Sequence, residues 1–394
     1  MSRTADAVII GGGLIGCSTA YHLAKRGMKR VVVVEKSTLG SGSSGKSSAI
    51  LRCHYTHPEL VRMALKSLSI FQNFSEAVGG QCGYTRTGYI VMVGPDNVDT
   101  LKKNVAMHKE IGVSVDMIDL QEVKKMVPGI NLEGIAAAAM EPESGYADPG
   151  LLMTSLVQRG RELGVQYLQM TPVVEILGGD SRVRGVKTPE EEIEAPVVVD
   201  CAGAWANRVA RLAGLEVPVE AHREQVVILE RPADFTGEHP VLSDLVLLQY
   251  MRSETGNLTL LGNSDLSESE VVDPDFYNEE TDLEAVENAT LKAVQRLPRL
   301  EDGQIRKGYS GCYEVTPDYQ ALIGPVPGLE GFYVNAGYSG HGFKFTPVAG
   351  EAMAELILDG DAQVFDVGLF SVTRFAEGRP IEGLNPYSRG QKLR

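Results

Sequence analysis

The fold of this chain is decided near its amino terminus, where it reads Asp6-Ala7-Val8-Ile9-Ile10-Gly11-Gly12-Gly13-Leu14-Ile15-Gly16 and then Val31-Val32-Val33-Val34-Glu35. These stretches predict an apolar strand, a G-x-G-x-x-G turn, a helix over residues 17–26 and a second strand that ends in a carboxylate. Gly27 follows the helix, where a C-cap requires a positive φ. Together they form a βαβ unit of the kind that binds a dinucleotide.

Each part of this unit has a physical role toward a dinucleotide. The first glycine permits the tight turn, the second lets the backbone approach a pyrophosphate, and the third lets helix and strand pack closely. The helix N-terminus faces the phosphates, and the acid 24 positions after Gly11 accepts hydrogen bonds from ribose hydroxyls. That acid argues against a 2′-phosphate and therefore favours FAD or NAD over NADP. The predicted contacts are Gly11, Gly13, Leu14, Ile15, Gly16, Glu35 and Lys36.

The composition limits the classes of partner and compartment. The chain has 394 residues, enough for about two domains, and a net charge of −15, which disfavours nucleic acids and anionic membranes. No stretch reaches the roughly 18 apolar residues of a membrane helix, and no signal peptide is recognisable. The five cysteines are odd in number and lack C-x-x-C spacing. We therefore expect a reducing compartment, by default the cytoplasm, and no metal site.

The rest of the chain does not read as a continuous doubly wound sheet. Residues 40–48 predict a loop of small residues, residues 89–93, 136–140, 165–168, 196–200 and 332–334 predict strands, and residues 173–186 predict a hairpin that turns at Gly178-Gly179-Asp180. Several strand segments follow within residues 219–261. Helices are expected over residues 58–78, 96–112, 148–164, 281–296 and 347–358.

Strand–glycine turn–helix units occur in the first, middle and last thirds of this pattern. We therefore predict an α/β protein, α+β overall, in which a discontinuous Rossmann-like domain is interrupted by a mainly antiparallel β substrate domain. The expected division assigns residues 1–82, 146–217 and 326–394 to the dinucleotide domain. Residues 83–145 and 218–325 form the substrate domain.

Five ordered blocks between residues 6 and 358 resemble a known family. They are the N-terminal unit, the loop over residues 43–55, and three motifs that read Asp200-Cys201-Ala202-Gly203-Ala204-Trp205, Gly311-Cys312-Tyr313-Glu314-Val315-Thr316-Pro317-Asp318 and Gly337-Tyr338-Ser339-Gly340-His341-Gly342-Phe343-Lys344-Phe345. Together they resemble flavoproteins of the D-amino-acid-oxidase superfamily, most closely the branch of sarcosine oxidase and dimethylglycine dehydrogenase.

The resemblance implies FAD, extended between the N-terminal unit and the final glycine turn. It also implies an oxidoreductase that oxidises the C–N bond of a small amino acid or N-methyl amino acid, such as sarcosine. The carbon beside nitrogen gives hydride to flavin N5, and the imine hydrolyses. The alternative is a β-type flavin-binding subunit of a hetero-oligomeric amine or proline dehydrogenase, with an electron-relay role and a partner subunit or electron-acceptor protein.

Arg52 and Lys344 match basic positions of the resembled family that hold the substrate carboxylate. Two cations offset the desolvation of a carboxylate in a pocket that contains little water, and Arg can bind it bidentately. Lys344 stands between Phe343 and Phe345, an unusual place for a solvated charge. We take this pair as the substrate anchor.

Three further residues are expected near the reacting atoms. Tyr313 matches a tyrosine that borders the substrate, although a core role is equally open, and Tyr250 is placed only by its distance before the segment over residues 258–262. His341 lies either beside the flavin, where a positive charge favours the anionic reduced ring, or in a structural role. Gly340 and Gly342 are expected to let backbone N–H groups approach the isoalloxazine.

The remaining predicted cofactor contacts come from loops and turns. The serine-rich loop supplies donors to the pyrophosphate or ribityl chain, residues 173–174 contact adenine through the backbone, and the 200–205 motif lines the cofactor. These contacts are Ser43, Ser44, Ser47, Ser48, Val173, Val174, Ala202, Gly203, Trp205, Gly311, Gly337, Ser339, Gly340, His341, Gly342 and Lys344.

Two departures from the family pattern change the chemistry we expect. Monomeric sarcosine oxidases attach FAD through a cysteine whose position falls on Gly311 here, one place before Cys312, and such a slip reverses the face of an extended segment. We therefore predict non-covalent FAD. Residues 257–262 contain no Lys or Arg, and Ala49 replaces a family arginine, so a cation that would stabilise superoxide is missing. Slow reaction with oxygen is the resulting hypothesis.

Overall fold

The N-terminal unit forms as the glycine pattern predicts. In the computed structural model, which describes residues 2–178, 181–265 and 269–387, strand β2 (Ala7–Ile10) leads into helix α1 (Leu14–Lys25) and strand β3 (Val31–Val34). Both strands are buried along their whole length and pair in parallel, with Ala7 beside Val31. Apolar β-branched residues suit strands covered on both faces, which explains the unbroken Val and Ile runs.

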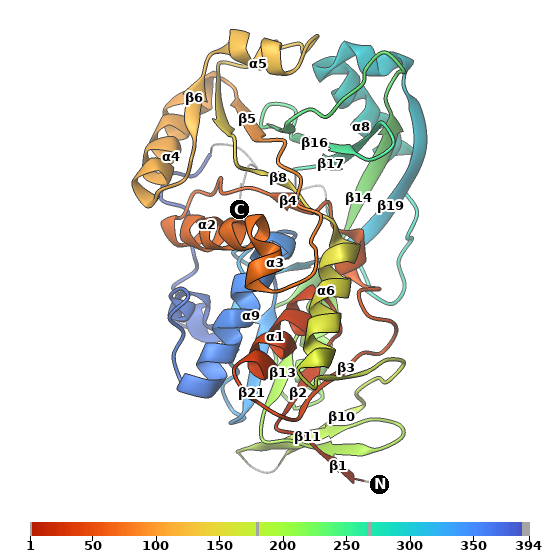
Figure 1. The fold of residues 1–394 in the computed structure, drawn as a ribbon, viewed down its shortest axis with the longest axis vertical. Helices are drawn as coiled ribbons and strands as arrows, with labels where there is room; N and C mark the ends of the chain where they lie inside the picture. The colour runs from red at the N-terminus through yellow and green to blue at the C-terminus, as the bar shows by residue number, and fades with distance from the viewer. Residues whose placement is uncertain (1, 179–180, 266–268, 388–394) are drawn as a thin grey trace.

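This unit lies at the centre of a six-stranded sheet built from three separate parts of the chain. The strand order is β20-β21-β13-β2-β3-β9, from β9 (Gln166–Leu168), β13 (Val198–Asp200), β20 (Leu322–Pro325) and β21 (Phe332–Ala336). All neighbours are parallel except β20 and β21. Helices α1, α6 (Pro149–Glu162) and α9 (Gly342–Asp359) lie side by side next to it (Figure 1).

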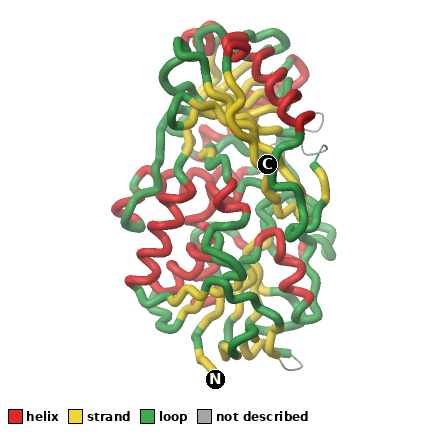
Figure 2. Tube along the Cα trace, turned by 90° about the vertical axis from the view of Figure 1, so that its right-hand side faces the viewer, coloured by secondary structure: helices red, strands yellow, loops and turns green. Residues whose placement is uncertain are grey.

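A second, larger sheet lies at the other end of the long axis. Its order is β18-β14-β17-β16-β15-β5-β7-β6, with β19 also paired to β14. Only the β5–β15 pair is parallel among the pairings of this sheet in the described residues. Figure 2 shows the two groups of strands separated along the vertical axis. The strands are β5 (Tyr89–Val93), β6 (Asp116–Ile118), β7 (Ala137–Glu141), β14 (Glu220–Glu230), β15 (Val241–Asp244), β16 (Gln249–Glu254), β17 (Leu258–Asn263), β18 (Glu270–Val271) and β19 (Gln304–Val315).

Smaller elements complete the chain. A four-stranded sheet and a two-stranded pair stand beside the main sheets. No helix in the described part of the chain is long and apolar enough to cross a bilayer. The elements are β1 (Ser2–Thr4), β10 (Glu175–Gly178), β11 (Val183–Lys187), β12 (Glu192–Glu194), β4 (Ile50–Leu51), β8 (Gly145–Tyr146), α2 (Pro58–Gln72), α3 (Phe74–Ala77), α4 (Val98–Ile111), α5 (Leu120–Met126), α7 (Ala206–Arg211) and α8 (Leu283–Arg296).

The predicted fold class is confirmed, with local corrections. Residues 43–46 form a 3-10 helix instead of an open loop, and the helix expected over residues 58–78 is interrupted at Asn73. The last helix begins at Gly342 and contains Pro347, because the left-handed residues of the turn end at Gly340. Pro347 was a misleading start signal, since a proline can lie inside a helix at the loss of one hydrogen bond.

The domain division remains a proposal. Strand β20, which the expected boundaries place in the substrate domain, pairs with β21 in the six-stranded sheet. Of the predicted hairpin turn, Gly178 ends β10, whereas Gly179 and Asp180 lie outside the described residues.

Candidate functional site

The glycine turn after β2 is packed too tightly for side chains. A Cβ on Gly11, whose φ is +108°, would lie 2.5 Å from the Cys201 carbonyl oxygen, and a Cβ on Gly16 would lie 2.0 Å from the Gly11 carbonyl oxygen. A Cβ on Gly13 would meet Ser44 Oγ at 3.0 Å. Gly13 is also the N-cap of α1 and provides no side-chain cap. The N-terminus of α1 therefore has the form of an anion site for a pyrophosphate.

Glu35 ends β3 beside this turn. Its Oε2 accepts the Gly12 N–H at 2.7 Å, and its Oε1 accepts the Ser37 N–H at 2.8 Å. Each carboxylate oxygen can accept more than one hydrogen bond, so these two contacts orient the group and leave capacity for ribose hydroxyls. This geometry supports the predicted role of Glu35.

Lys36 and Trp205 lie together, as neighbouring cofactor contacts should. The Lys36 Nζ lies 3.9 Å from the Trp205 ring centre and pairs with Asp275, which also accepts the Trp205 Nε1–H at 2.9 Å. Arg208 pairs with Asp275 as well. The sequence analysis missed Asp275, because it lies 70 positions beyond Trp205 with no local motif.

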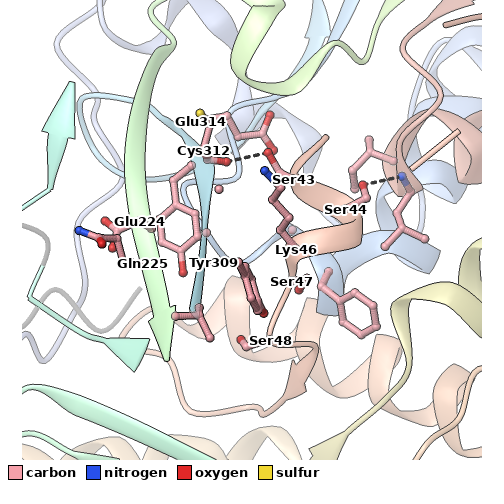
Figure 3. A pocket seen from close by; sticks show the side chains of 18 of the residues that line it. Ser43, Ser44, Lys46, Ser47, Ser48, Glu224, Gln225, Tyr309, Cys312 and Glu314 are labelled. Carbon is pink, nitrogen blue, oxygen red and sulfur yellow. Dashed lines mark hydrogen bonds between the residues drawn. The ribbon is translucent and has the colours of Figure 1, made fainter. Parts of the chain in front are cut away.

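The serine loop connects the start of α1 with strand β19. Ser44 Oγ accepts the Leu14 N–H at 3.0 Å, and Ser43 donates to the Cys312 carbonyl at 2.6 Å (Figure 3). Ser47 Oγ accepts the Ala49 N–H at 3.0 Å. The hydroxyl groups of Ser43, Ser44 and Ser47 therefore hold the loop against its neighbours.

A pocket between this loop, α1, β14, β19 and the final glycine turn collects many of the predicted residues (Figure 3). It is also lined by residues that the sequence analysis did not select, among them Lys46, Glu224 and Glu314. The predicted residues that line it are Leu14, Ile15, Ser43, Ser44, Ser47, Ser48, Tyr250, Gly311, Tyr313, Gly340 and Gly342.

Two tyrosine rings in this pocket lie where glycines leave room. The Tyr313 ring occupies the space that a Cβ on Gly340 would take, at 2.3 Å, and the Tyr250 ring does the same at Gly262, at 2.0 Å. Burial raises the pKa of Tyr250, so it is a neutral hydroxyl at physiological pH. Both rings therefore border the pocket, Tyr250 as a neutral group.

Arg52 and Lys344 converge on the ring of Tyr55. The Arg52 guanidinium carbon lies 4.4 Å from the ring centre and the Lys344 Nζ 6.0 Å, although 292 positions separate them in sequence. Lys344 is buried in the first turn of α9, and Arg52 donates to the His54 carbonyl. Burial acts to lower the pKa of Arg52, and Tyr55, Tyr89 and Glu141 outweigh it and hold that pKa above its ordinary value.

His341 contacts the same tyrosine, Tyr55. Its Nδ1 lies 3.2 Å from the Tyr55 hydroxyl, and its Nε2 lies 3.0 Å from the Tyr319 carbonyl. The carbonyl can only accept, so Nε2 carries the hydrogen and Nδ1 accepts from Tyr55. Both ring nitrogens contact protein groups, which supports the structural role of His341.

The other predicted contacts are not among the residues that line this pocket. Ala202 donates its N–H to Asp200 at 3.0 Å, Gly337 donates to Glu314 Oε2 at 3.1 Å, and the Ser339 N–H donates to the Glu314 carbonyl at 3.0 Å. The Val174 N–H bonds to the Lys187 carbonyl at 2.8 Å, so that donor is used by the four-stranded sheet. Val173 packs against the hydrophobic core that includes Ile176 and Val186 of β10 and β11. Gly203 faces Glu314.

Comparison with known proteins decides the family. The sequence profile of the DAO family, FAD dependent oxidoreductases, matches residues 6–356. The chain belongs to this family. FAD is therefore its cofactor, and the chain is an FAD-dependent oxidoreductase, as predicted. The glycine turn, the start of α1 at Gly13 and Glu35 fit that cofactor.

Two of the proteins similar to this chain have names that specify an amino-acid substrate. The chain is 28% identical over 420 residues to FAD-dependent oxidoreductase domain-containing protein 1 of Xenopus laevis, covering 96% of this chain and 84% of that protein. It is 29% identical to the mitochondrial sarcosine dehydrogenase of Homo sapiens, covering 95% of this chain and only 42% of that protein. The crystal structure of L-proline dehydrogenase from P. horikoshii superposes with a TM-score of 0.89 at 29% identity, covering 97% of this chain and 100% of that chain.

Glu314 is an ionisable group of the pocket that the sequence analysis quoted in a motif but gave no role. Burial raises its pKa to about 7, and backbone N–H groups of Gly337 and Tyr338 oppose the shift. The folded protein therefore holds a proton on Glu314 more tightly than the unfolded chain does.

We predict that Glu314 makes the stability of the apoprotein depend on pH. Between about pH 4.5 and pH 7, rising pH should lower the free energy of unfolding of the wild type by up to about 3 kcal/mol relative to Glu314→Gln. Urea unfolding at several pH values measures this difference. Glu330→Gln, an exposed acid paired with Arg182, is the control and should follow the wild type.

We also predict that FAD is not covalently attached. The Cys312 side chain packs with Ala204 and Ala221, and burial raises the pKa of its thiol, which disfavours the reactive thiolate. Acid precipitation should release all flavin into the supernatant and leave a polypeptide of the sequence mass. A precipitated polypeptide whose measured mass exceeds the sequence mass by that of a flavin would contradict the prediction.

Proposed function

We propose that this chain oxidises the C–N bond of a small amino acid or N-methyl amino acid, such as sarcosine. The observation that carries the proposal is the convergence of Arg52 and Lys344, two cations from opposite ends of the chain, on the ring of Tyr55. Two proteins similar to this chain, a sarcosine dehydrogenase and a proline dehydrogenase, are also named for substrates with a carboxylate beside an amine.

In this proposal the glycine turn over residues 11–16 and Glu35 would hold FAD, which would supply the acceptor for a hydride from the carbon beside nitrogen. The imine product would then be hydrolysed by water. Arg52 and Lys344 bind the carboxylate and thereby fix the orientation of that carbon. Tyr313 and Tyr250 border the substrate from the pocket side. Orientation in a site of low water content supplies a large part of the rate acceleration, since an amine bound in its neutral form needs no general base.

The experiment is an anaerobic panel of amines mixed with the FAD-loaded protein. Sarcosine, dimethylglycine, glycine and both enantiomers of proline test the substrate class, and dimethylamine, which lacks the carboxylate, is the negative control. Loss of visible flavin absorbance with an amino acid and not with dimethylamine supports the proposal. Equal bleaching by the amino acids and by dimethylamine, or no bleaching by any compound of the panel, would contradict the proposal.

We further predict that reduced enzyme reacts slowly with oxygen. Strand β17 spans Leu258–Asn263 and contains no Lys or Arg, so no cation from this strand can stabilise superoxide. Stopped-flow mixing of reduced enzyme with air-saturated buffer should give reoxidation slower than reduction by substrate, and an artificial electron-accepting dye should restore turnover. Rapid peroxide formation contradicts this prediction.

A second candidate is the flavin-binding subunit of a larger amine or proline dehydrogenase. Four large apolar side chains within residues 271–291, Val271, Phe276, Leu283 and Leu291, are 61–84% exposed. Exposed apolar side chains gathered in one segment are typical of a protein contact. Turnover of the isolated chain with the dye separates this candidate from the first. We keep the cytoplasm as the proposed compartment, because all five cysteines are free and buried.

A further inference from the structure

Three buried polar side chains next to Arg52 have no role in the site described above. They are Glu141 at the end of β7, His54 after β4 and His108 in α4, and their exposed fractions are 2%, 0% and 0%. One oxygen or nitrogen from each lies within 4.8 Å of the other two. Burial of three ionisable groups together is costly unless their hydrogen bonds and charges are satisfied.

Some polar atoms of the cluster are buried without a hydrogen bond. Glu141 Oε2 accepts the Cys53 N–H at 2.8 Å and the Ser144 hydroxyl at 2.6 Å. Glu141 Oε1, His54 Nδ1 and His108 Nδ1 have no hydrogen-bond partner among the described residues, and the first two lie 4.0 Å apart. His108 Nε2 lies 2.8 Å from the Tyr55 carbonyl, so that nitrogen carries the hydrogen and Nδ1 is a lone pair. His54 Nε2 lies 2.7 Å from the Tyr387 hydroxyl. Glu141 Oε1 is thus a buried carboxylate oxygen without a hydrogen bond, and a proton placed on it would make it a donor.

The charges around Glu141 indicate that it would gain a proton when a substrate carboxylate binds nearby. Glu141 acts electrostatically on Arg52, and Cys53, whose N–H it accepts, lies in the field of both Arg52 and Lys344. Without substrate, the Glu141 carboxylate lies in the field of the Arg52 cation. A substrate carboxylate adds a second negative charge, and two nearby carboxylates in a dry site resist being ionised together. A metal dication in the cluster would instead add to the two positive charges.

We propose that binding of a substrate carboxylate at Arg52 and Lys344 is coupled to the uptake of one proton from solvent by Glu141, at its Oε1. The inference rests on the proposed function. Glu141 is then a positioning residue, because it anchors the Cys53 backbone beside Arg52 and adjusts its charge to that of the ligand. No bond other than the new O–H is formed.

The groups that face Glu141 favour it as the proton acceptor. Burial raises the pKa of Glu141, opposed by Ser144, the Cys53 N–H and Arg52. Burial lowers the pKa of His108 to about 4 and holds that of His54 well below its ordinary value, so both rings stay neutral. The titratable and charged groups around it are Arg52, Cys53, His54, Tyr55, Tyr89, His108, Lys344 and Tyr387.

The coupling predicts how anion affinity changes with pH. Below the pKa of Glu141 in the ligand-free protein the site is already protonated, and a carboxylate binds at full affinity. As pH rises above that value, Kd should increase by up to about tenfold per pH unit, until the pKa of the ligand-bound form is passed. Glu141→Gln removes the titration, so its Kd should stay low and nearly constant over the same range.

The experiment uses the FAD-loaded protein and acetate, which stays ionised from about pH 6 to pH 10. Flavin absorbance gives Kd at each pH, and calorimetry in two buffers of different ionisation heat counts the protons taken up. Glu143→Gln changes a partly exposed acid two positions away, paired with Arg86, and should behave as wild type. Neutral acetamide should cause no proton uptake in any variant.

The outcomes separate the inference from the proposed function. Proton uptake with acetate that is lost in Glu141→Gln supports the coupling. The coupling is overturned if wild type binds acetate without proton uptake, if Glu141→Gln keeps the pH dependence, or if a stoichiometric metal resists chelation in wild type and is absent from Glu141→Gln. If Glu141→Gln does not fold, the absence of proton uptake in the wild type still overturns the coupling. Acetate binding that Arg52→Ala leaves unchanged would overturn the proposed carboxylate site itself.

Discussion

Replacing Arg52 with alanine should lower kcat/KM for an amino-acid substrate by about 100-fold or more. Truncating one partner of a buried, hydrogen-bonded charge pair costs about 2–5 kcal/mol, much of it from the carboxylate that is left unpaired. Lys344 would remain as a point charge, so activity should not vanish. Arg52→Lys should be intermediate, because an ammonium cannot make the bidentate contact. Steady-state kinetics with the best substrate of the panel measures the effect.

The same kinetics contain their own control. Arg62 lies ten positions later on α2, is largely exposed and pairs with Glu59, so Arg62→Ala should keep wild-type kinetics. An amine without a carboxylate should react equally poorly with wild type and Arg52→Ala. If Arg52→Ala impairs both kinds of substrate to the same degree, the arginine supports the fold and not the substrate.

Gly16→Ala should lower FAD affinity by about 10- to 100-fold. Its new methyl group would lie 2.0 Å from the Gly11 carbonyl oxygen, a backbone atom of the tight turn that cannot move aside as a flexible side chain would. Overpacking of this kind costs about 1–3 kcal/mol. The helix start would have to shift away from the turn, which separates its N–H groups from the pyrophosphate. Titration of apoprotein with FAD, followed by fluorescence quenching, measures Kd.

Gly27→Ala is the matched control for this change. Gly27 lies at the other end of the same helix, has a φ of +101°, and an added Cβ would meet nothing within 4 Å. That variant should lose about 1 kcal/mol of stability through backbone strain and bind FAD as wild type does. Full flavin affinity in Gly16→Ala would show that close packing at the turn is dispensable.

The features predicted from sequence are those that leave a local signal. The glycine turn, the Val31–Val34 strand and Glu35 are adjacent residues whose spacing reports backbone requirements directly. Arg52 and Lys344 were found only because the motifs around them resemble a family, since nothing in their spacing indicates that they meet at Tyr55.

The residues that were missed act across long sequence distances. Glu141 contacts Cys53, 88 positions earlier, and Asp275 contacts Trp205, 70 positions earlier. An isolated acid in a strand or loop looks the same whether it is solvated or buried, because its partner is chosen by tertiary packing. The prediction that the last helix begins at Pro347 was wrong for the opposite reason. Proline is a strong local signal for a helix start, but the end of the preceding turn places the start at Gly342.

The central sheet has a consequence for how the chain is made. Strand β2 has β13 on one side, and β13 in turn needs β21, so neighbours 190 and more residues away must exist before the edge of β2 is covered. During synthesis β3 can pair with one edge of β2, but the other edge stays uncovered for about half of translation, and an exposed apolar strand edge is prone to aggregation. Folding dominated by such distant pairings is slow, and we expect the yield of yellow protein to depend on growth temperature and on chaperones that shield nascent chains.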